Sequence, residues 1–497
     1  MKPTVQQNAF FQEVQNGNTS ILLEAVAGSG KTTSIMGCLP YTGNKTVKIC
    51  AFNKSIAEEI NTKLKKEGYD FRKASAGTVH SIGFGALRKL LGDVKIDAKK
   101  VRSLVDDLYE DFAHEDREEL LNSVVKMVGL AKQAGIGPIY RIDDDQKWYD
   151  MMDHFEVINS DKIDPVLLKD MSVRVLNLSN KTRTVVDFDD MIYLPLLLKA
   201  RFWQSDIVIV DEAQDLNETR RALVMAIVKP GGRVFVVGDR RQAIYGFTGA
   251  DSNSLDLMQQ ITKAKRMPLS VCFRCDKDIV SFAQKWNPEI EAFEGKGQGK
   301  VSSMGYADFL KIENLSPNDV MLCRNTAPLV ETAFALIKMG KAVRVEGRDI
   351  GENLKKLAQR WKVKTASALI NKLDEFMARE RQKFIEKKQE ERIQSVEDKV
   401  ETLKVIIDRC LESGKMMVSD VVSEIENLFE DSNGKKDVFT LSTGHKAKGR
   451  EWERVFIFKF KETIPSPYAK KAWQLEQENN LAYVMATRAE HELVMVD

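Results

Sequence analysis

The residues best suited to chemistry in this 497-residue chain form a glycine-rich segment near its N-terminus. Residues 25–32 read AVAGSGKT and follow the apolar run 21–23, which is typical of a strand. A strand that opens through glycines into a helix gathers backbone N–H groups around phosphate oxygens, at the positive end of the helix dipole. The pattern predicts a phosphate-binding loop, in which Lys31 reaches the β- and γ-phosphates of a nucleotide and the Thr32 hydroxyl binds Mg²⁺.

Two acids, Asp211 and Glu212, follow a second apolar run, IVIV at residues 207–210. A continuous run of this kind predicts a central parallel strand that is buried on both faces. Open α/β sheets bind ligands at the C-terminal ends of such strands. We therefore expect Asp211 to hold Mg²⁺ through its water shell, and Glu212 to orient or deprotonate the attacking water.

The segments around these residues resemble the superfamily 1A DNA helicases of the UvrD/Rep/PcrA type. DEAQD at 211–215 is followed by VGDRRQAIYGF at 237–247, and the further motifs appear in the family's order. These motifs are QQNAF (6–10), AFNKSIA (51–57), GTVHS (77–81), FR (273–274), STGHKAKGRE (442–451) and LAYVMATRA (481–489). FNKSIA and HKAKG are closest in wording to the F-box DNA helicase branch, but we expect no F-box, because the first motif starts almost at the N-terminus.

The resemblance implies an α/β fold with two RecA-like P-loop motor domains, each built on a parallel sheet and carrying a mainly helical insertion. Motor domain 1A would comprise 1–87 and 181–268, with its sheet resuming near Val185, and the helical insertion 1B would comprise 88–180. Motor domain 2A would comprise 269–348 and 433–497, and the small helical insertion 2B would comprise 349–432.

The resemblance also implies the nucleotide contacts. Gln6 resembles the adenine-reading glutamine, and Phe273 lies where the family stacks an aromatic ring on adenine. Glu451 matches a glutamate that reaches the nucleotide from the second motor domain. The other expected contacts come from the phosphate loop and the helix after it: Ala27, Gly28, Ser29, Gly30, Lys31, Thr32 and Thr33.

Three further residues would link hydrolysis to domain closure. Gln242 would sense the γ-phosphate, Arg488 would act as an arginine finger, and Arg274 would supply a second cation. Such cations stabilise transition-state charge and contribute on the order of 10³ to 10⁵ in rate. Hydrolysis would then be fast only when both motor domains close on one ATP.

The same motifs imply a grip on single-stranded DNA through stacking and backbone contacts. The expected stacking residues are Phe52, Tyr245 and Phe247. The expected phosphate or sugar contacts are Thr78, His80, Thr443 and His445. Each stacking residue would supply about 1–3 kcal/mol per base.

Some positions depart from the family pattern. Thr248 and Thr33 stand where relatives often carry arginine, which weakens the expected DNA and base contacts there. Arg240 replaces an acidic or small residue and is expected to add positive charge near the cleft.

Composition agrees with an intracellular, cytoplasmic protein. The net charge is only +2, so DNA-binding charge must be concentrated locally. No secretion signal or membrane span is expected, because the apolar runs are short. Cys272 and Cys275 form a lone C-x-x-C without further zinc ligands, and we interpret the pair as packing.

The sequence thus predicts an ATP-dependent DNA helicase or translocase that uses ATP and Mg²⁺ and moves 3′→5′ on single-stranded DNA. Its partners would be single-stranded DNA, single-strand/duplex junctions and replication or recombination proteins. One alternative is a translocase that strips bound proteins without productive unwinding. The other is a P-loop kinase or small-substrate ATPase, which would not need Arg274, Arg488 or the stacking aromatics.

Overall fold

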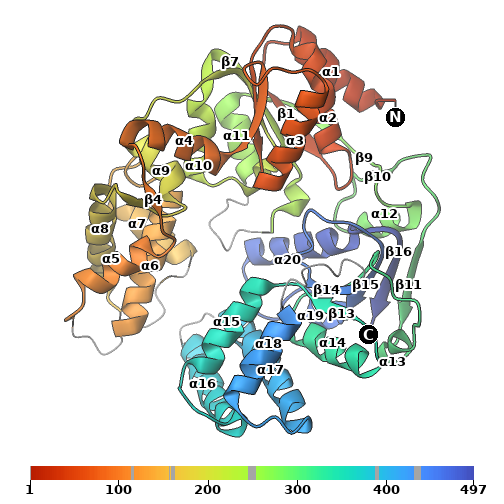
Figure 1. The fold of residues 1–497 in the computed structure, drawn as a ribbon. Coiled ribbons are helices and arrows are strands. Elements are labelled where there is room, and N and C mark those ends of the chain that lie inside the picture. The colour runs from red at the N-terminus through yellow and green to blue at the C-terminus, as the bar shows by residue number, and fades with distance from the viewer. Residues whose placement is uncertain are drawn as a thin grey trace. The chain divides into compact units, whose positions relative to one another are not determined.

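The structure is a computed structural model that describes residues 2–112, 117–155, 157, 163–244, 253–386, 391–429 and 438–497. The chain divides into two compact units, and each contains a six-stranded sheet (Figure 1). The first unit comprises Met1–Val26 and Gly30–Leu269, and the second comprises Ala27–Ser29 and Ser270–Asp497. All strand pairs in both large sheets are parallel, and the predicted fold class is confirmed.

The sheet of the first unit has the strand order β3-β2-β6-β7-β1-β8. Its strands are β1 (Ile21–Ala25), β2 (Val47–Ala51), β3 (Ala74–Thr78), β6 (Ser205–Val210), β7 (Val228–Gly238) and β8 (Lys265–Leu269). Alternate residues of β1 enter different cores: Ile21 and Leu23 enter one, and Leu22 enters the other. Burial on both faces explains the continuous apolar runs at 21–23 in β1 and 207–210 in β6.

Helices cover the two faces of this sheet. The core that contains Ile21 is shared with α1 (Val5–Asn16), α2 (Lys31–Cys38) and α3 (Lys54–Lys66). The core that contains Leu22 is shared with α4 (Val79–Leu91), α9 (Asp190–Leu197), α10 (Glu218–Ala226) and α11 (Ser254–Thr262). Strands β1 and β6, which lead into the candidate site, therefore lie between two layers of helices.

A separate helical core lies between β3 and β6 in the chain. It contains α5 (Lys100–Leu108), α6 (Arg117–Gln133), α7 (Asp145–His154) and α8 (Pro165–Lys181). A buried ion network joins these helices to the start of α9. Lys100 Nζ lies 2.6 Å from Asp190 Oδ2, and Lys132 Nζ lies 2.6 Å from Asp187 Oδ2 and 2.7 Å from Asp190 Oδ1.

The large sheet was expected to resume near Val185, but it does not do so. Strand β5 (Val185–Val186) instead pairs with β4 (Lys95–Ile96) in a two-stranded sheet of its own. The chain turns directly afterwards, because Asp187 and Asp190 are held by the buried lysines of the helical core. The large sheet resumes at β6.

The sheet of the second unit has the order β11-β16-β15-β12-β14-β13. Its strands are β11 (Lys300–Met304), β12 (Asp319–Cys323), β13 (Val343–Val345), β14 (Phe439–Thr443), β15 (Trp452–Phe458) and β16 (Ala489–Val496). A short pair, β9 (Val271–Cys272) and β10 (Glu291–Ala292), accompanies it. The helices outside the insertion are α12 (Lys277–Ala283), α13 (Tyr306–Leu310), α14 (Ala327–Lys338), α19 (Phe460–Thr463) and α20 (Ala472–Ala486).

In the described part of the segment between β13 and β14, the chain forms four helices: α15 (Arg348–Gln359), α16 (Ala366–Glu386), α17 (Glu391–Glu412) and α18 (Val418–Phe429). Their apolar sides join the same core as the sheet. Asp398 of α17 also accepts hydrogen bonds from the backbone N–H groups of Thr326 and Ala327 at the start of α14. The insertion is therefore built into the second unit. Within the described part of the chain, no helix combines the length and apolar character needed to cross a bilayer.

Candidate nucleotide site and nucleic-acid pocket

Three adjacent strands of the first unit end at the candidate site. Strand β7 pairs with β6 on one side and with β1 on the other. Because the strands are parallel, the loops that follow them leave the same edge of the sheet. These loops carry Lys31 after β1, Glu212 after β6 and Gln242 after β7.

Backbone conformation in the loop after β1 is typical of a phosphate cradle. Gly28 and Gly30 have φ angles of +67° and +77°, a region that favours glycine. Gly30 is the N-cap of α2, so the first N–H groups of that helix point toward the loop. Ser29 is only 2% exposed, yet its hydroxyl has no hydrogen-bond partner among the described residues. The orphaned hydroxyl and the glycine turn fit an anionic ligand.

Residues Ala27–Ser29 of this loop belong to the second unit, and the following contacts lie within that unit. The Gly28 carbonyl accepts a hydrogen bond from the Phe273 N–H at 2.8 Å, and the Ala27 N–H donates to the Tyr483 hydroxyl at 3.0 Å. A Cβ atom at Gly28 would lie 2.6 Å from the Cβ of Arg274. Glycine is therefore needed at position 28 for space as well as for its φ angle.

Lys31 and Glu212 form an ion pair, with 3.1 Å between Lys31 Nζ and Glu212 Oε1. Burial lowers the pKa of Lys31, but the negative charges of Glu212, Asp239 and Asp211 outweigh it and raise that pKa overall. Lys31 is thus a fixed cation surrounded by three acids.

Asp211 and Glu212 differ in environment although they are neighbours. Burial, followed by the charge of Glu212, raises the pKa of Asp211 to about 7. Asp211 Oδ1 accepts a hydrogen bond from the Glu212 N–H at 3.0 Å. Glu212 has a φ of +52°, which is strained for a non-glycine residue and marks functional sites more often than other places. Asp211 and the Thr32 hydroxyl are the oxygen donors that could hold Mg²⁺, an ion that usually takes one or two carboxylates and keeps several waters.

Gln214 bridges the ends of β6 and β7, and sequence reasoning gave it no role. Its Nε2 donates to Glu212 Oε2, and its Oε1 accepts the Asp239 N–H at 3.1 Å. Burial raises the pKa of Asp239 to about 6, against the lowering effect of Lys31. The available signal was position, because Gln214 lies two residues after Glu212 and Asp239 ends the neighbouring apolar run.

Gln242 lies next to this bridge. Its Nε2 donates to Asp239 Oδ2 at 2.7 Å, within the short helix η3 (Arg240–Gln242). The adjacent Arg240 was expected to add positive charge near the cleft, but its charge is paired with acids of the first unit. Its guanidinium binds Glu24 Oε1 at 2.6 Å and both oxygens of Asp256 at 2.9 and 3.0 Å.

Two residues that were expected near the adenine of the nucleotide lie on helices that flank the phosphate loop. Gln6 is half-buried in α1, and Thr33 is exposed in α2. The neighbouring Gln7, by contrast, is buried and structural, since it caps α1 with Thr4 and donates to Ser34 Oγ at 3.0 Å.

The predicted residues of the second unit form a cluster of their own. Arg274 Nε donates to Glu451 Oε2 at 2.6 Å, and Arg274 Nη1 donates to the Thr487 carbonyl at 3.2 Å. Arg488 is 1% exposed, and its guanidinium donates to the carbonyls of Val484 and Arg450. Phe273 packs against Phe293, with 5.0 Å between ring centroids.

Cys272 and Cys275 flank this cluster. The six cysteines of the chain are buried and free of disulfides. In the described ranges, no group of three or more His, Cys, Asp or Glu side chains could hold a metal ion.

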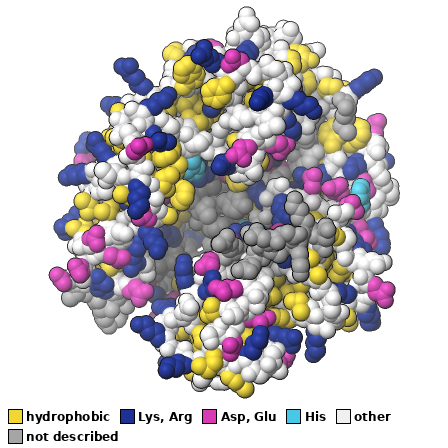
Figure 2. Space-filling model, viewed as in Figure 1, with side chains coloured by type: hydrophobic (Ala, Val, Ile, Leu, Met, Phe, Trp, Pro, Cys, Tyr) yellow, Lys and Arg dark blue, Asp and Glu magenta, His cyan; other side chains and the backbone are white. Residues whose placement is uncertain are grey.

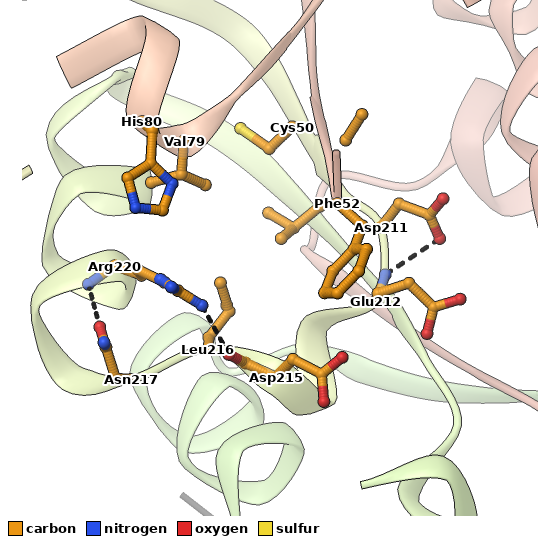
Figure 3. Close-up of a pocket in the computed structure, with 12 residues that line it drawn as sticks. Cys50, Phe52, Val79, His80, Asp211, Glu212, Asp215, Leu216, Asn217 and Arg220 are labelled. Carbon is orange, nitrogen blue, oxygen red and sulfur yellow. Dashed lines mark hydrogen bonds between the residues drawn. The ribbon is translucent and has the colours of Figure 1, made fainter. Parts of the chain in front are cut away.

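A pocket of about 310 Å³ opens beside the acid pair in the first unit (Figure 3). Phe52 follows β2 and is 43% exposed, and His80 lies in the first turn of α4. Figure 3 shows both rings directed into the pocket, with Arg220 of α10 below His80. Burial, then the charge of Arg220, lowers the pKa of His80 to about 4, so its imidazole is neutral. Asp211, Glu212 and Phe52 all line this pocket.

The other predicted nucleic-acid residues are distributed as follows. The Thr78 hydroxyl caps α4 by accepting the Ser81 N–H at 3.0 Å. Thr443 ends β14 in the second unit, and His445 follows it, with a pKa lowered to about 3 by burial and by Arg324 and Lys448. Tyr245 and Phe247, like Thr248, lie outside the described residues.

The face drawn in Figure 2 does not mark a nucleic-acid site by charge alone, because Lys and Arg side chains are interspersed there with Asp and Glu. The pocket and its aromatic wall are the feature that fits a nucleic acid.

Two family models match the chain along almost its whole length. The model of the UvrD/REP helicase N-terminal domain matches residues 6–263, and the model of the UvrD-like helicase C-terminal domain matches residues 244–496. The chain belongs to the UvrD/REP helicase family.

Curated relatives carry helicase names. A probable DNA helicase II homolog of Mycoplasma genitalium is 25% identical over 313 residues, which cover 57% of this chain and 42% of the relative. The ATP-dependent DNA helicase Rep of Escherichia coli is 34% identical over 166 residues, which cover 31% of this chain and 24% of Rep. DNA helicase IV of Escherichia coli is 25% identical over 315 residues, 55% of this chain and 46% of the relative. In each case the match spans less than half of the relative's length.

Within this UvrD/REP family member, Lys31, Asp211, Glu212 and Gln242 lie together in the first unit, and their predicted roles stay predictions. The first unit also adds Gln214 and Asp239 as the groups that hold Glu212 and Gln242 in position.

Proposed function

We propose that the chain is an ATP-dependent DNA helicase that moves 3′→5′ along single-stranded DNA and unwinds duplex DNA at single-strand/duplex junctions. The observation that carries this proposal is the pocket in the first unit. It is lined on one side by the acids Asp211 and Glu212, and on the other by Phe52 and His80. Residues suited to phosphate chemistry and residues suited to base stacking thus share one cavity.

ATP is the proposed substrate because the residues around Lys31 fit a nucleoside triphosphate. The ammonium of Lys31 binds the phosphates in place of its contact with Glu212. Glu212 then takes a proton from the attacking water. Gln214 keeps the Glu212 carboxylate on the side of β7. Mg²⁺ held by Thr32 and Asp211 would neutralise phosphate charge.

DNA is the proposed track because Phe52 offers a stacking surface that tolerates any base. A base in the pocket would contact Phe52, which directly follows β2, and would lie beside Glu212. Occupancy by DNA can therefore alter the Glu212 environment directly. The roles predicted for Arg274, Glu451 and Arg488 extend this scheme to the second unit and remain predictions, as does any contact with replication or recombination proteins.

A second candidate function is an ATP-driven translocase that removes bound proteins without productive unwinding. The observation that favours it is the insertion α15–α18, whose helices share one core with the second sheet. A motor without an independent module for duplex DNA would translocate more readily than it unwinds.

The test uses two duplexes that differ only in a 3′ or a 5′ single-stranded tail. The proposal expects ATP-dependent strand separation with the 3′ tail and little with the 5′ tail. Equal or reversed preference would contradict the polarity. Displacement of streptavidin from a biotinylated single strand without strand separation would favour the second candidate.

A further inference from the structure

We propose that Arg220 reads the edge of a nucleobase held in the pocket beside Glu212, favouring bases that present two adjacent hydrogen-bond acceptors. The inference rests on the proposed function, since it takes single-stranded DNA as the ligand. It adds a specificity-determining residue to a site that would otherwise bind by stacking alone.

The Arg220 guanidinium is incompletely bonded within the protein. Its Nη1 donates to the Asp215 carbonyl at 3.2 Å, but its Nε is buried and has no hydrogen-bond partner. No carboxylate of the described residues forms an ion pair with it. The Arg220 N–H is bonded to the Asn217 side chain, which fixes the start of α10 and the direction of the side chain. An unsatisfied buried donor is costly, and a small shift of the guanidinium that brought Nε to a ligand acceptor would relieve that cost.

The charges of the pocket argue against a phosphate as the partner of Arg220. Glu212 and Asp215 line the same cavity as Arg220, and their negative charges repel an anion. His80 gives no compensating charge, because burial and Arg220 lower its pKa to about 4. A neutral ligand meets no such repulsion.

The walls of the pocket favour a flat ring. Phe52, Val79 and Leu216 supply apolar surface, and Figure 3 shows the Phe52 ring across the space from Arg220 and His80. A nucleobase stacked on Phe52 presents its polar edge toward the far wall, where the guanidinium lies. The arrangement combines a stacking platform with a few polar groups, as small-molecule sites do.

The fork of donors on arginine selects among bases. Arginine pairs best with two adjacent acceptors, such as O6 and N7 of guanine. Cytosine offers N3 and O2 in the same way. Thymine interrupts its acceptors with the N3–H donor, and adenine places its N6 amino group between N1 and N7. Because oligo(dG) folds on itself, cytosine against thymine is the cleaner comparison.

The experiment measures binding of labelled oligo(dC) and oligo(dT) of equal length by fluorescence anisotropy. The wild-type chain is expected to bind oligo(dC) about fivefold more tightly or better. Arg220→Lys keeps the charge but not the fork, and should lose the preference while retaining oligo(dT) affinity. Arg88→Gln, an exposed arginine in the last turn of α4, is the matched control and should keep the preference.

Three results would overturn the inference. They are equal binding of both oligonucleotides by the wild type, an unchanged preference in Arg220→Lys, and a uniform loss for both in Arg220→Gln with a salt slope reduced by about one, which indicates a phosphate contact. An oligonucleotide of 2-pyrimidinone, which keeps N3 and O2 but lacks the amine, tests the wild type without any variant. It should bind like oligo(dC), and binding like oligo(dT) would overturn the inference. Failure to bind any oligonucleotide would instead contradict the proposed function.

Discussion

Nζ of Lys31 lies 3.1 Å from Oε1 of Glu212, so the residue predicted to bind phosphate holds the residue predicted to activate water. In the proposed function, a nucleotide phosphate takes the place of Glu212 on Lys31, and the same event releases Glu212 from this ion pair. Mutation can therefore test phosphate binding by Lys31 and water activation by Glu212 separately.

Lys31→Ala should weaken ATP binding and abolish turnover, because it removes the cation among Asp211, Glu212 and Asp239. Glu212→Gln should retain nucleotide binding and cut hydrolysis by about 10² or more, the scale of a lost general base. Steady-state ATPase assays and titration with a fluorescent nucleotide measure the two effects. Turnover by Glu212→Gln at the parent rate would assign water activation to another residue.

Gln214→Leu should lower kcat about tenfold to a hundredfold with little change in KM for ATP, since it releases Glu212 and Asp239 from their shared partner. Gln204→Leu is the matched control, because Gln204 is exposed just before β6 and its side chain donates to the Ala226 carbonyl, away from the acid pair. A kcat for Gln214→Leu equal to that of the control would show that the bridge has no catalytic consequence.

Phe52→Ala should weaken single-stranded DNA binding by about 1–3 kcal/mol while basal ATPase changes little. Phe71 gives the comparison, because it is 76% exposed in the same unit but does not line the pocket. Phe71→Ala should bind DNA as the wild type does. If both variants lost affinity equally, general surface effects would explain the loss better than stacking.

Asp189 should make the first unit less stable as pH rises. Burial, then the charge of Asp187, raises its pKa to about 6, whereas the unfolded chain titrates near the ordinary value of about 3.9. The folded state holds the proton more tightly, so the cost appears as pH rises from about 4 to 6 and is complete above that range. Asp189→Asn should therefore raise the urea midpoint at pH 8 more than at pH 4, by an amount on the order of 1–3 kcal/mol in unfolding free energy.

The control for this titration is Asp93→Asn, since the Asp93 side chain is 97% exposed. Its urea midpoint should follow the wild type at both pH values. An Asp189→Asn midpoint that moves equally at pH 4 and pH 8 would argue against a titrating Asp189.

Local sequence was enough to predict the sheet edge that carries the site. Apolar runs at 21–23 and 207–210 fixed two strands, and parallel order brought Lys31 and Glu212 to the same edge. The glycine pattern predicted the phosphate loop, and Gly28 and Gly30 do adopt positive φ. These features depend on neighbours in the chain and on strand direction, which a motif encodes.

Long-range partners were not predictable in the same way. Val185 has the residue types of a sheet strand, but Asp187 and Asp190 are drawn away by Lys132 of α6, 55 or more residues distant. Arg240 was expected to add positive charge near the cleft, yet Glu24 and Asp256 from other elements pair with it. Gln214 links Glu212 to Asp239 only because the fold places β6 beside β7. Each of these outcomes depends on side chains that meet through the fold.

The rate of ATP hydrolysis with and without single-stranded DNA tests the central claim most directly. The account predicts a low basal rate that single-stranded DNA stimulates at least about tenfold, since Phe52, His80 and Glu212 line one pocket. Glu212→Gln should abolish the stimulated rate. A wild-type rate that DNA leaves unchanged would contradict the account, because the pocket would then not join DNA to the chemistry.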